Sequence, residues 1–192
     1  MKQILLIMAV ALGQSGLAAD KKPLITNPIV EKDIRYRLKK PTGELTKVDL
    51  EKVTLLNLNE TQITDAGLKD IAKLQKLTML VLSYTKITDA GLKELAKLQK
   101  LDYLTLGETK ITDAGLKEVA KLQNLTLLFL SNTQITDAGL KDIAKLQKLK
   151  GLSLHSTKIT HAGVAELKKA LPKCKIEWTT YKYDDKGNLK AD

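Results

Sequence analysis

At positions 61–68 the chain reads Thr-Gln-Ile-Thr-Asp-Ala-Gly-Leu, and the same octet, with small changes, returns at 85–92, 109–116, 133–140 and 157–164. The interval from each copy to the next is therefore constant, at twenty-four positions. A fixed period of this length is typical of a solenoid, in which one supersecondary unit recurs along the chain. The sequence predicts five tandem units, framed as 53–76, 77–100, 101–124, 125–148 and 149–172.

Each unit contains two hydrophobic periods. Residues 77–82 read Leu-x-x-Leu-x-Leu, and the alternation at the end predicts a short strand. Residues 92–98 read Leu-x-x-Leu-Ala-x-Leu, which is the spacing of one helical face. Thr88 and Asp89 precede this half, and their oxygens suit the free N–H groups of a helix start. Because one unit cannot bury both faces alone, we expect stacked strands on one side and stacked helices on the other.

The pattern L-x-x-L-x-L-x-x-T-x-I-T-D-A-G-L resembles the leucine-rich repeat, in the subtype that carries I-T-D-x-G-L. The resemblance covers 53–172 and implies a right-handed α/β solenoid, with a parallel sheet on the concave face and short helices on the convex face. The family usually places Asn or Cys where this chain has threonine, and we expect the hydroxyls to satisfy backbone groups between coils; the threonines are Thr61, Thr85, Thr109, Thr133 and Thr157.

The flanks of the repeats, at 39–46 and 171–176, resemble the ends of exported bacterial members of this family. In the predicted N-terminal helical cap, 20–52, helical spacing over 29–38 must end before Pro41. A second helical stretch is predicted at 46–53.

A C-terminal cap strand and tail are predicted over 173–192. Ile176 and Trp178 lie one full period after Leu152 and Leu154 of the last unit, which predicts a sixth strand with Trp178 closing the core. The tail from Thr179 is expected to be a turn or a frayed end.

The first nineteen residues have the order of a secretory signal peptide. Lys2 gives a positive start, residues 4–12 are uninterrupted apolar residues, and small residues lead to Asp20. The apolar run is about half of the ~20 residues that a membrane-spanning helix needs. We therefore expect a secreted or periplasmic protein, cleaved after Ala18 or Ala19. I-T-D-x-G-L repeats also occur in substrate receptors of intracellular ubiquitin ligases, but the predicted signal peptide argues against that role for this chain.

The chain has a formal charge of +10, which favours anionic partners such as acidic glycans or lipids. Nucleic acid is disfavoured because aromatic residues make up only 4% of an exported chain. Two lysine ladders are expected on the convex helices, interspersed with Asp70, Glu94, Glu118 and Asp142; the ladders are Lys69, Lys93, Lys117, Lys141 and Lys73, Lys97, Lys121, Lys145.

Candidates for catalysis and metal binding are weak, and we predict neither an enzyme nor a cofactor. The only cysteine, Cys174, aligns with a position one strand over and five residues before His155. At ~3.3 Å per residue along a strand, the two side chains are expected to lie about 16 Å apart. A nucleophile and its base must lie within about 3 Å of each other, so the pair is a poor catalytic candidate. His161 replaces the octet's Asp in the last unit and lacks a metal-ligand spacing. One Asp per unit stands where a helix is expected to begin, which favours a role at the helix N-terminus over a row of calcium ligands; these residues are Asp65, Asp89, Asp113 and Asp137.

The units are nearly identical in their helices and differ in their strands. Outward strand positions point to the concave face because the side-chain period of a strand is two. Residues at or beside these positions form an apolar patch that we predict to bind a protein partner: Leu55, Met79, Val81, Tyr84, Tyr103, Leu127 and Phe129. A polar margin comes from Asp102, Glu108, Asn132, Lys150 and His155. The alternative is an envelope or surface component that binds acidic glycan or lipid through the convex lysines, and salt dependence separates the two.

We predict that the exported form begins at Ala19 or Asp20, because cleavage follows the small residues after the apolar run. N-terminal sequencing of secreted material measures this directly. Secreted chains that still begin with Met1 would rule the signal peptide out.

Overall fold

The computed structural model describes residues 22–179, 181–183 and 189–191, and the predicted signal peptide lies outside them. Two helices come first, α1 (Pro28–Leu38) and α2 (Lys47–Leu50). Strands and helices then alternate as β1 (Leu55–Asn57), α3 (Asp65–Ile71), β2 (Met79–Val81), α4 (Asp89–Leu95), β3 (Tyr103–Thr105), α5 (Asp113–Val119), β4 (Leu127–Phe129), α6 (Asp137–Ile143), β5 (Gly151–Ser153), α7 (His161–Ala170) and β6 (Lys175–Glu177). Two strands follow, β7 (Tyr181–Tyr183) and β8 (Leu189–Ala191).

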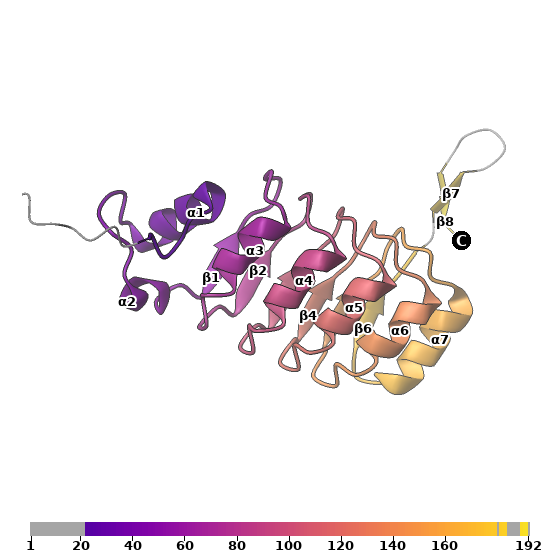
Figure 1. The fold of residues 1–192 in the computed structure, drawn as a ribbon. Helices are drawn as coiled ribbons and strands as arrows, with labels where there is room; N and C mark the ends of the chain where they lie inside the picture. Colours follow the sequence, from indigo (N-terminus) through magenta and orange to yellow (C-terminus); the bar gives the residue numbers. More distant parts are fainter. Residues whose placement is uncertain (1–21, 180, 184–188, 192) are drawn as a thin grey trace, which may run out of the picture.

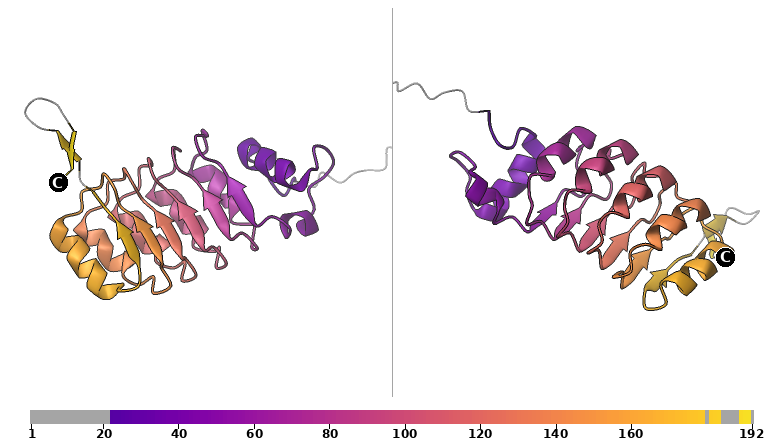
Figure 2. Two further views of the ribbon diagram at one scale, coloured as in Figure 1. Left: turned by 180° about the vertical axis from the view of Figure 1, so that it is seen from behind. Right: turned by 60° about the horizontal axis from the view of Figure 1, so that its bottom comes forward.

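The strands β1 to β6 form one parallel sheet in chain order, and α3 to α7 cover one of its faces (Figure 1). Each strand residue pairs with its equivalent in the next unit, so that Leu55 lies beside Met79 and Met79 beside Tyr103. The offset between strands equals the sequence period, which confirms the predicted α/β solenoid. Seen from behind, the other face of the sheet carries no helix (Figure 2). We call this face the sheet face; it is the one expected to be concave.

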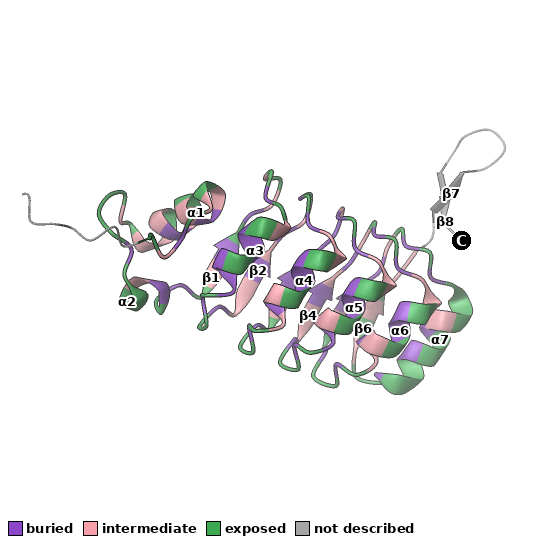
Figure 3. Cartoon of the chain, viewed as in Figure 1, coloured by how far each residue is buried: buried purple, intermediate pink, exposed green. Residues whose placement is uncertain are grey.

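Leucine fills the space between the sheet and the helices. The inward strand residues Leu56, Leu80, Leu104 and Leu128 have no exposed surface, and the helical Leu116 is 1% exposed. Figure 3 shows the short helices buried on the side that meets the sheet and exposed on the other. Burying one leucine contributes about 1.5–3 kcal/mol. Because the chain has a single cysteine, this ladder of leucines replaces any internal disulfide as the source of stability.

The recurrent threonines act within each coil. The Thr85 hydroxyl donates to the carbonyl oxygen of Leu82 at 2.6 Å, and the Thr133 hydroxyl donates to that of Leu130 at 2.7 Å. The other three threonines make the same bond three residues back. The expectation that these hydroxyls bridge neighbouring coils is therefore wrong. They satisfy a buried carbonyl where the chain leaves the strand.

Neighbouring coils are joined instead by the Asp and the second Thr of the octet. Asp89, the first residue of α4, accepts bonds from the Thr112 backbone N–H at 2.9 Å and from the Thr112 hydroxyl at 2.6 Å. The other three aspartates make the same two bonds to the next coil. Their position in the first helical turn agrees with the predicted helix-start role, and the bond to the next coil is a second role that was not predicted.

The glycine of the octet leaves room for that carboxylate. A Cβ atom on Gly115 would overlap Asp89 Oδ1, and one on Gly139 would overlap Asp113 Oδ1 in the same way. A side chain larger than hydrogen would push the coils apart at this point. Aspartate in one coil and threonine and glycine in the next thus form a single interlocking contact.

The N-terminal segment covers the first coil where a preceding coil would stand. Asp70 is only 3% exposed; it accepts bonds from the backbone N–H groups of Thr26 and Asn27, each at 2.7 Å, and pairs with Lys73 at 2.6 Å. Burial raises the pKa of Asp70, but these partners outweigh it and hold the pKa below its ordinary value. The prediction that Asp70 lies on the solvated helical surface is wrong, because the N-terminal segment covers it.

The first two helices follow the sequence pattern with one difference. In α1, Val30 and Ile34 are fully buried, and the helix ends at Lys39 in the left-handed region with φ 51°. Thr46 and Asp49 cap α2 reciprocally. This helix ends at Leu50 and is shorter than the predicted stretch 46–53, because the chain must extend into β1.

At the other end, β6 pairs with β5 and places Ile176 beside Leu152. Trp178 packs partly buried against the core, and its ring meets that of His161 edge-on at 4.5 Å. The tail, expected to be a turn or frayed end, contains the antiparallel pair β7–β8, while 184–188 lie outside the described residues. Among the described helices, none is long and apolar enough to span a bilayer.

Leu104→Ala is expected to lower the free energy of unfolding by about 2–5 kcal/mol, because it opens a cavity in the central coil that the stacked backbones cannot fill. Urea denaturation followed by circular dichroism measures this. Exposed Lys110→Ala, in the same unit, is the control and is expected to change stability by less than about 0.5 kcal/mol. An unchanged midpoint for Leu104→Ala would contradict the repeat frame.

Candidate binding surface on the sheet

The register of the sheet places the outward strand residues in two adjacent rows. One row runs through Leu55, Met79, Tyr103, Leu127 and Gly151, and the other runs through Asn57, Val81, Thr105, Phe129 and Ser153. Of the seven predicted patch residues, six are half-buried and Tyr84 is exposed. Six of them lie on neighbouring strands about 4.8 Å apart and Tyr84 follows β2 in the adjoining turn, so they form a continuous surface. We call these seven residues the sheet patch.

A small hollow lies near the middle of the sheet patch. The rings of Tyr103 and Phe129 lie 5.4 Å apart, centre to centre, and are tilted by 41°. Together with Tyr84 they line a hollow of about 240 Å³, whose other lining residues are Ser83, Thr105, Gly107, Glu108 and Ser131. We call this the aromatic hollow. The sequence pattern predicted its three rings and the outward position of Thr105, although Thr105 is buried, but it did not predict Gly107.

A glycine is the sequence signal for this hollow. At the position of Gly107, the flanking units have Ser83 and Ser131. Gly107 lines the hollow beside the three rings, and a Cβ atom there would lie 3.1 Å from the Ser131 carbonyl oxygen, so a larger residue would crowd the next coil. Once the units are aligned by their octets, this position carries Asn59, Ser83, Gly107, Ser131 and His155, and the glycine is the smallest residue of the series.

Tyr84 occupies a strained backbone position. One residue in each unit has positive φ just after the strand, and the series runs Glu60, Tyr84, Glu108, Asn132 and Ser156. Asparagine tolerates the left-handed region, whereas a tyrosine there costs of order 1–3 kcal/mol. The Tyr84 side chain is also 57% exposed, so burial offsets little of that cost. Stability therefore does not account for a tyrosine at this position.

The ends of the sheet patch differ in chemistry. Beside β1, the Asn57 backbone N–H donates to Asp33 of α1 at 3.2 Å, so α1 borders the patch. At the other end, His155 bonds to the Thr179 hydroxyl at 2.7 Å. Glu177 of β6 forms an ion pair that lowers its pKa. The polar margin therefore extends onto β6, which was predicted as a strand but not as part of the margin.

The repeats match a known family. A family model described as Leucine Rich repeat matches residues 45–72, 73–96 and 121–144. The chain is a leucine-rich-repeat protein. No curated protein matches its sequence.

Two solved structures resemble this leucine-rich-repeat protein. A leucine-rich-repeat protein of Leptospira interrogans is 32% identical over 70% of this chain and 34% of its own, with a TM-score of 0.55. An internalin of Listeria monocytogenes is 22% identical over 86% of this chain and 60% of its own, with a TM-score of 0.52, and shows the fold alone. The chain thus spans about a third of the Leptospira protein and three-fifths of the internalin.

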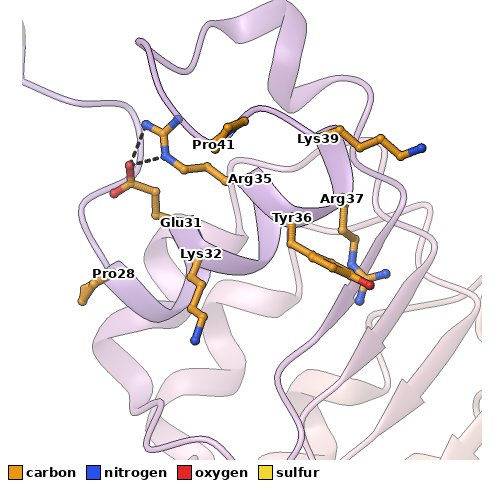
Figure 4. Close-up of a pocket in the computed structure, with 8 residues that line it drawn as sticks. All are labelled: Pro28, Glu31, Lys32, Arg35, Tyr36, Arg37, Lys39 and Pro41. Carbon is orange, nitrogen blue, oxygen red and sulfur yellow. Dashed lines mark hydrogen bonds and ion pairs between the residues drawn. The ribbon is translucent and has the colours of Figure 1, made fainter.

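A larger hollow lies on the outer surface of α1, away from the sheet. Its lining comes from this helix and the following loop, and Lys32, Tyr36 and Lys39 point outward in different directions rather than toward one centre (Figure 4). Arg35 is engaged with Glu31 at 2.8 Å and with two backbone carbonyls. A ligand site needs a few convergent polar groups. This hollow is therefore the outer face of a capping helix.

The two lysine ladders on the helices differ. Lys73, Lys97, Lys121 and Lys145 form ion pairs with an acid three residues earlier. Within the described residues, the second ladder forms no ion pair; it consists of Lys69, Lys93, Lys117 and Lys141. Half of the charge expected on this surface is thus neutralised by neighbouring acids.

Cys174 and His155 are not brought together as a nucleophile and its base. The register places Lys175 beside Gly151, which leaves Cys174 level with Lys150 and away from His155. Burial raises the pKa of the Cys174 thiol, the opposite of what activates a thiol.

Tyr84→Asn is expected to leave the free energy of unfolding within about 1 kcal/mol of the parent or to raise it, because asparagine suits the left-handed backbone and already occupies the equivalent position at Asn132. Denaturant unfolding measures this. A loss as large as that of a buried side chain, more than about 2 kcal/mol, would show that Tyr84 is kept for packing.

Proposed function

We propose that this leucine-rich-repeat protein is an exported, non-enzymatic binding module whose sheet face binds a protein partner. The fold is one commonly used for protein interaction. The observation that carries the proposal is the sheet patch: half-buried apolar side chains and an exposed, strained tyrosine on the face that no helix covers. An apolar centre with a polar margin is the usual anatomy of a protein contact site.

The variation between units supports the same face. The helical octets repeat nearly unchanged, while the outward strand residues vary, and the only repeated residue in either row is the leucine at 55 and 127. The helices need identical residues because each coil must lock onto the next. Two outward strand residues do bond to a neighbouring coil, since the Thr105 hydroxyl accepts from the Leu82 N–H and Ser153 bonds to Ser131. The apolar side chains of the sheet patch make no such bond in the described part of the chain, so they are free to specify a partner.

The second candidate function is binding of acidic glycan or lipid through the helical face. The unpaired lysine ladder, within the part of the chain that the structure describes, is the observation that favours it. Charge-driven binding weakens steeply with salt, whereas apolar binding hardly does. The two candidates therefore differ in a measurable way.

Phe129→Asp and Tyr103→Asp are each expected to weaken binding of the physiological partner at least about 100-fold, because a carboxylate in an apolar contact loses its water without gaining a partner. The mature chain serves as bait for envelope and secreted proteins from its source, and affinity is then measured for the captured protein. Circular dichroism on each variant controls for folding.

Lys117→Glu is the matched control, because Lys117 lies in the same unit as Tyr103 but on the helical face. It is expected to change affinity by less than about twofold at 0.15 M salt. If Lys117→Glu weakens binding more than Phe129→Asp does, the sheet face is not the binding surface and the lysine ladder replaces it.

A further inference from the structure

The aromatic hollow combines rings with one acidic side chain. Tyr84, Tyr103 and Phe129 supply three ring surfaces, and Glu108 supplies a carboxylate at the same hollow. Its volume of about 240 Å³ is below the roughly 300–1,000 Å³ of sites that take a whole small molecule. The hollow is therefore of the size for one side chain of a larger partner.

Most acidic side chains of this chain are occupied elsewhere. Among the described residues, nine form ion pairs with lysine or arginine, and four form the bonds between coils. Glu108 and Asp102 belong to neither group, and both flank β3, the strand that supplies Tyr103. Lys110 lies two residues beyond Glu108 in the loop without forming an ion pair with it in the described structure.

An unpaired carboxylate at a hollow lined by aromatic rings weakens binding unless the partner neutralises it. In a chain of net charge +10, cationic side chains are abundant, yet none is paired with Glu108 in the part that the structure describes. The charge at this point of the sheet face is thus complementary to a cation that comes from outside the chain.

Arginine matches these groups best. A guanidinium ion stacks flat on an aromatic ring and pairs with a carboxylate through two parallel N–H bonds. We propose that the aromatic hollow binds the guanidinium group of an arginine from the protein partner, with Glu108 pairing its charge and Tyr103 and Phe129 contacting its plane. This inference rests on the proposed use of the sheet face for protein binding.

The test uses two acetylated and amidated tripeptides, Gly-Arg-Gly and the same peptide with citrulline, the uncharged isostere of arginine. Amide chemical shifts of Gly107, Glu108 and Phe129 in the full mature chain report binding at the hollow. The arginine peptide is expected to bind with a dissociation constant on the order of millimolar, at least about fivefold more tightly than the citrulline peptide.

Glu108→Gln is expected to remove most of that preference, whereas Glu60→Gln is expected to change affinity by less than about twofold. The two glutamates have the same backbone conformation, two units apart, but only Glu108 lines the hollow. The inference is overturned if both peptides bind equally, if the two variants weaken binding equally, or if no hollow residue shifts at about 10 mM arginine peptide. Should that happen while Phe129→Asp still abolishes partner binding, the sheet-face function stands and only the arginine assignment fails.

Discussion

The contact between the Asp of one coil and the Thr and Gly of the next is the constraint on which this structure depends. The carboxylate binds one backbone N–H and one hydroxyl of the following coil, and the glycine leaves space for it, so the three residues specify one spacing and one register between coils. The leucine ladder supplies most of the burial, but burial alone is not directional. Directional bonds at the four steps between the five units keep the period of the repeat uniform from β1 to β5, and β6 follows a unit in which His161 replaces the Asp.

Because the contact between coils lies on the helical side, the residues of the sheet face are free to carry a function. The helical side must repeat because it carries the contact between coils, and its free surface is largely lysines, half of them paired with acids. The outward strand residues have no part in that contact. Tyr84, Tyr103 and Phe129 can therefore gather around Gly107 without disturbing the stacking, and a strained backbone at Tyr84 is tolerated because the coils on both sides fix it.

Sequence periodicity was sufficient for the solenoid, its frame and the two outward rows, because a side-chain period of two and a unit of constant length fix which residues are neighbours. It failed where contacts depend on three-dimensional closeness between elements. The burial of Asp70 comes from Thr26 and Asn27, distant in sequence, and the bond between Asp89 and Thr112 spans two coils. The three rings of the aromatic hollow belong to the predicted patch and Glu108 to the predicted polar margin, but the hollow itself was not predicted, because the small size of Gly107 adds nothing to a hydrophobic pattern.

A double-mutant cycle between Asp89 and Thr112 tests the contact between coils most directly. Asp89→Ala, Thr112→Val and the double variant are compared by denaturant unfolding. A coupling of about 1–2 kcal/mol is expected from the bond between the Thr112 hydroxyl and the Asp89 carboxylate, because each substitution removes it, whereas the Thr112 backbone N–H is kept in Thr112→Val. The same cycle between Asp89 and Thr136, one coil further away, is expected to be additive within about 0.5 kcal/mol. A coupling near zero for Asp89 and Thr112 would contradict the account, since it would mean that the bond between the hydroxyl and the carboxylate adds nothing to the stacking of the coils.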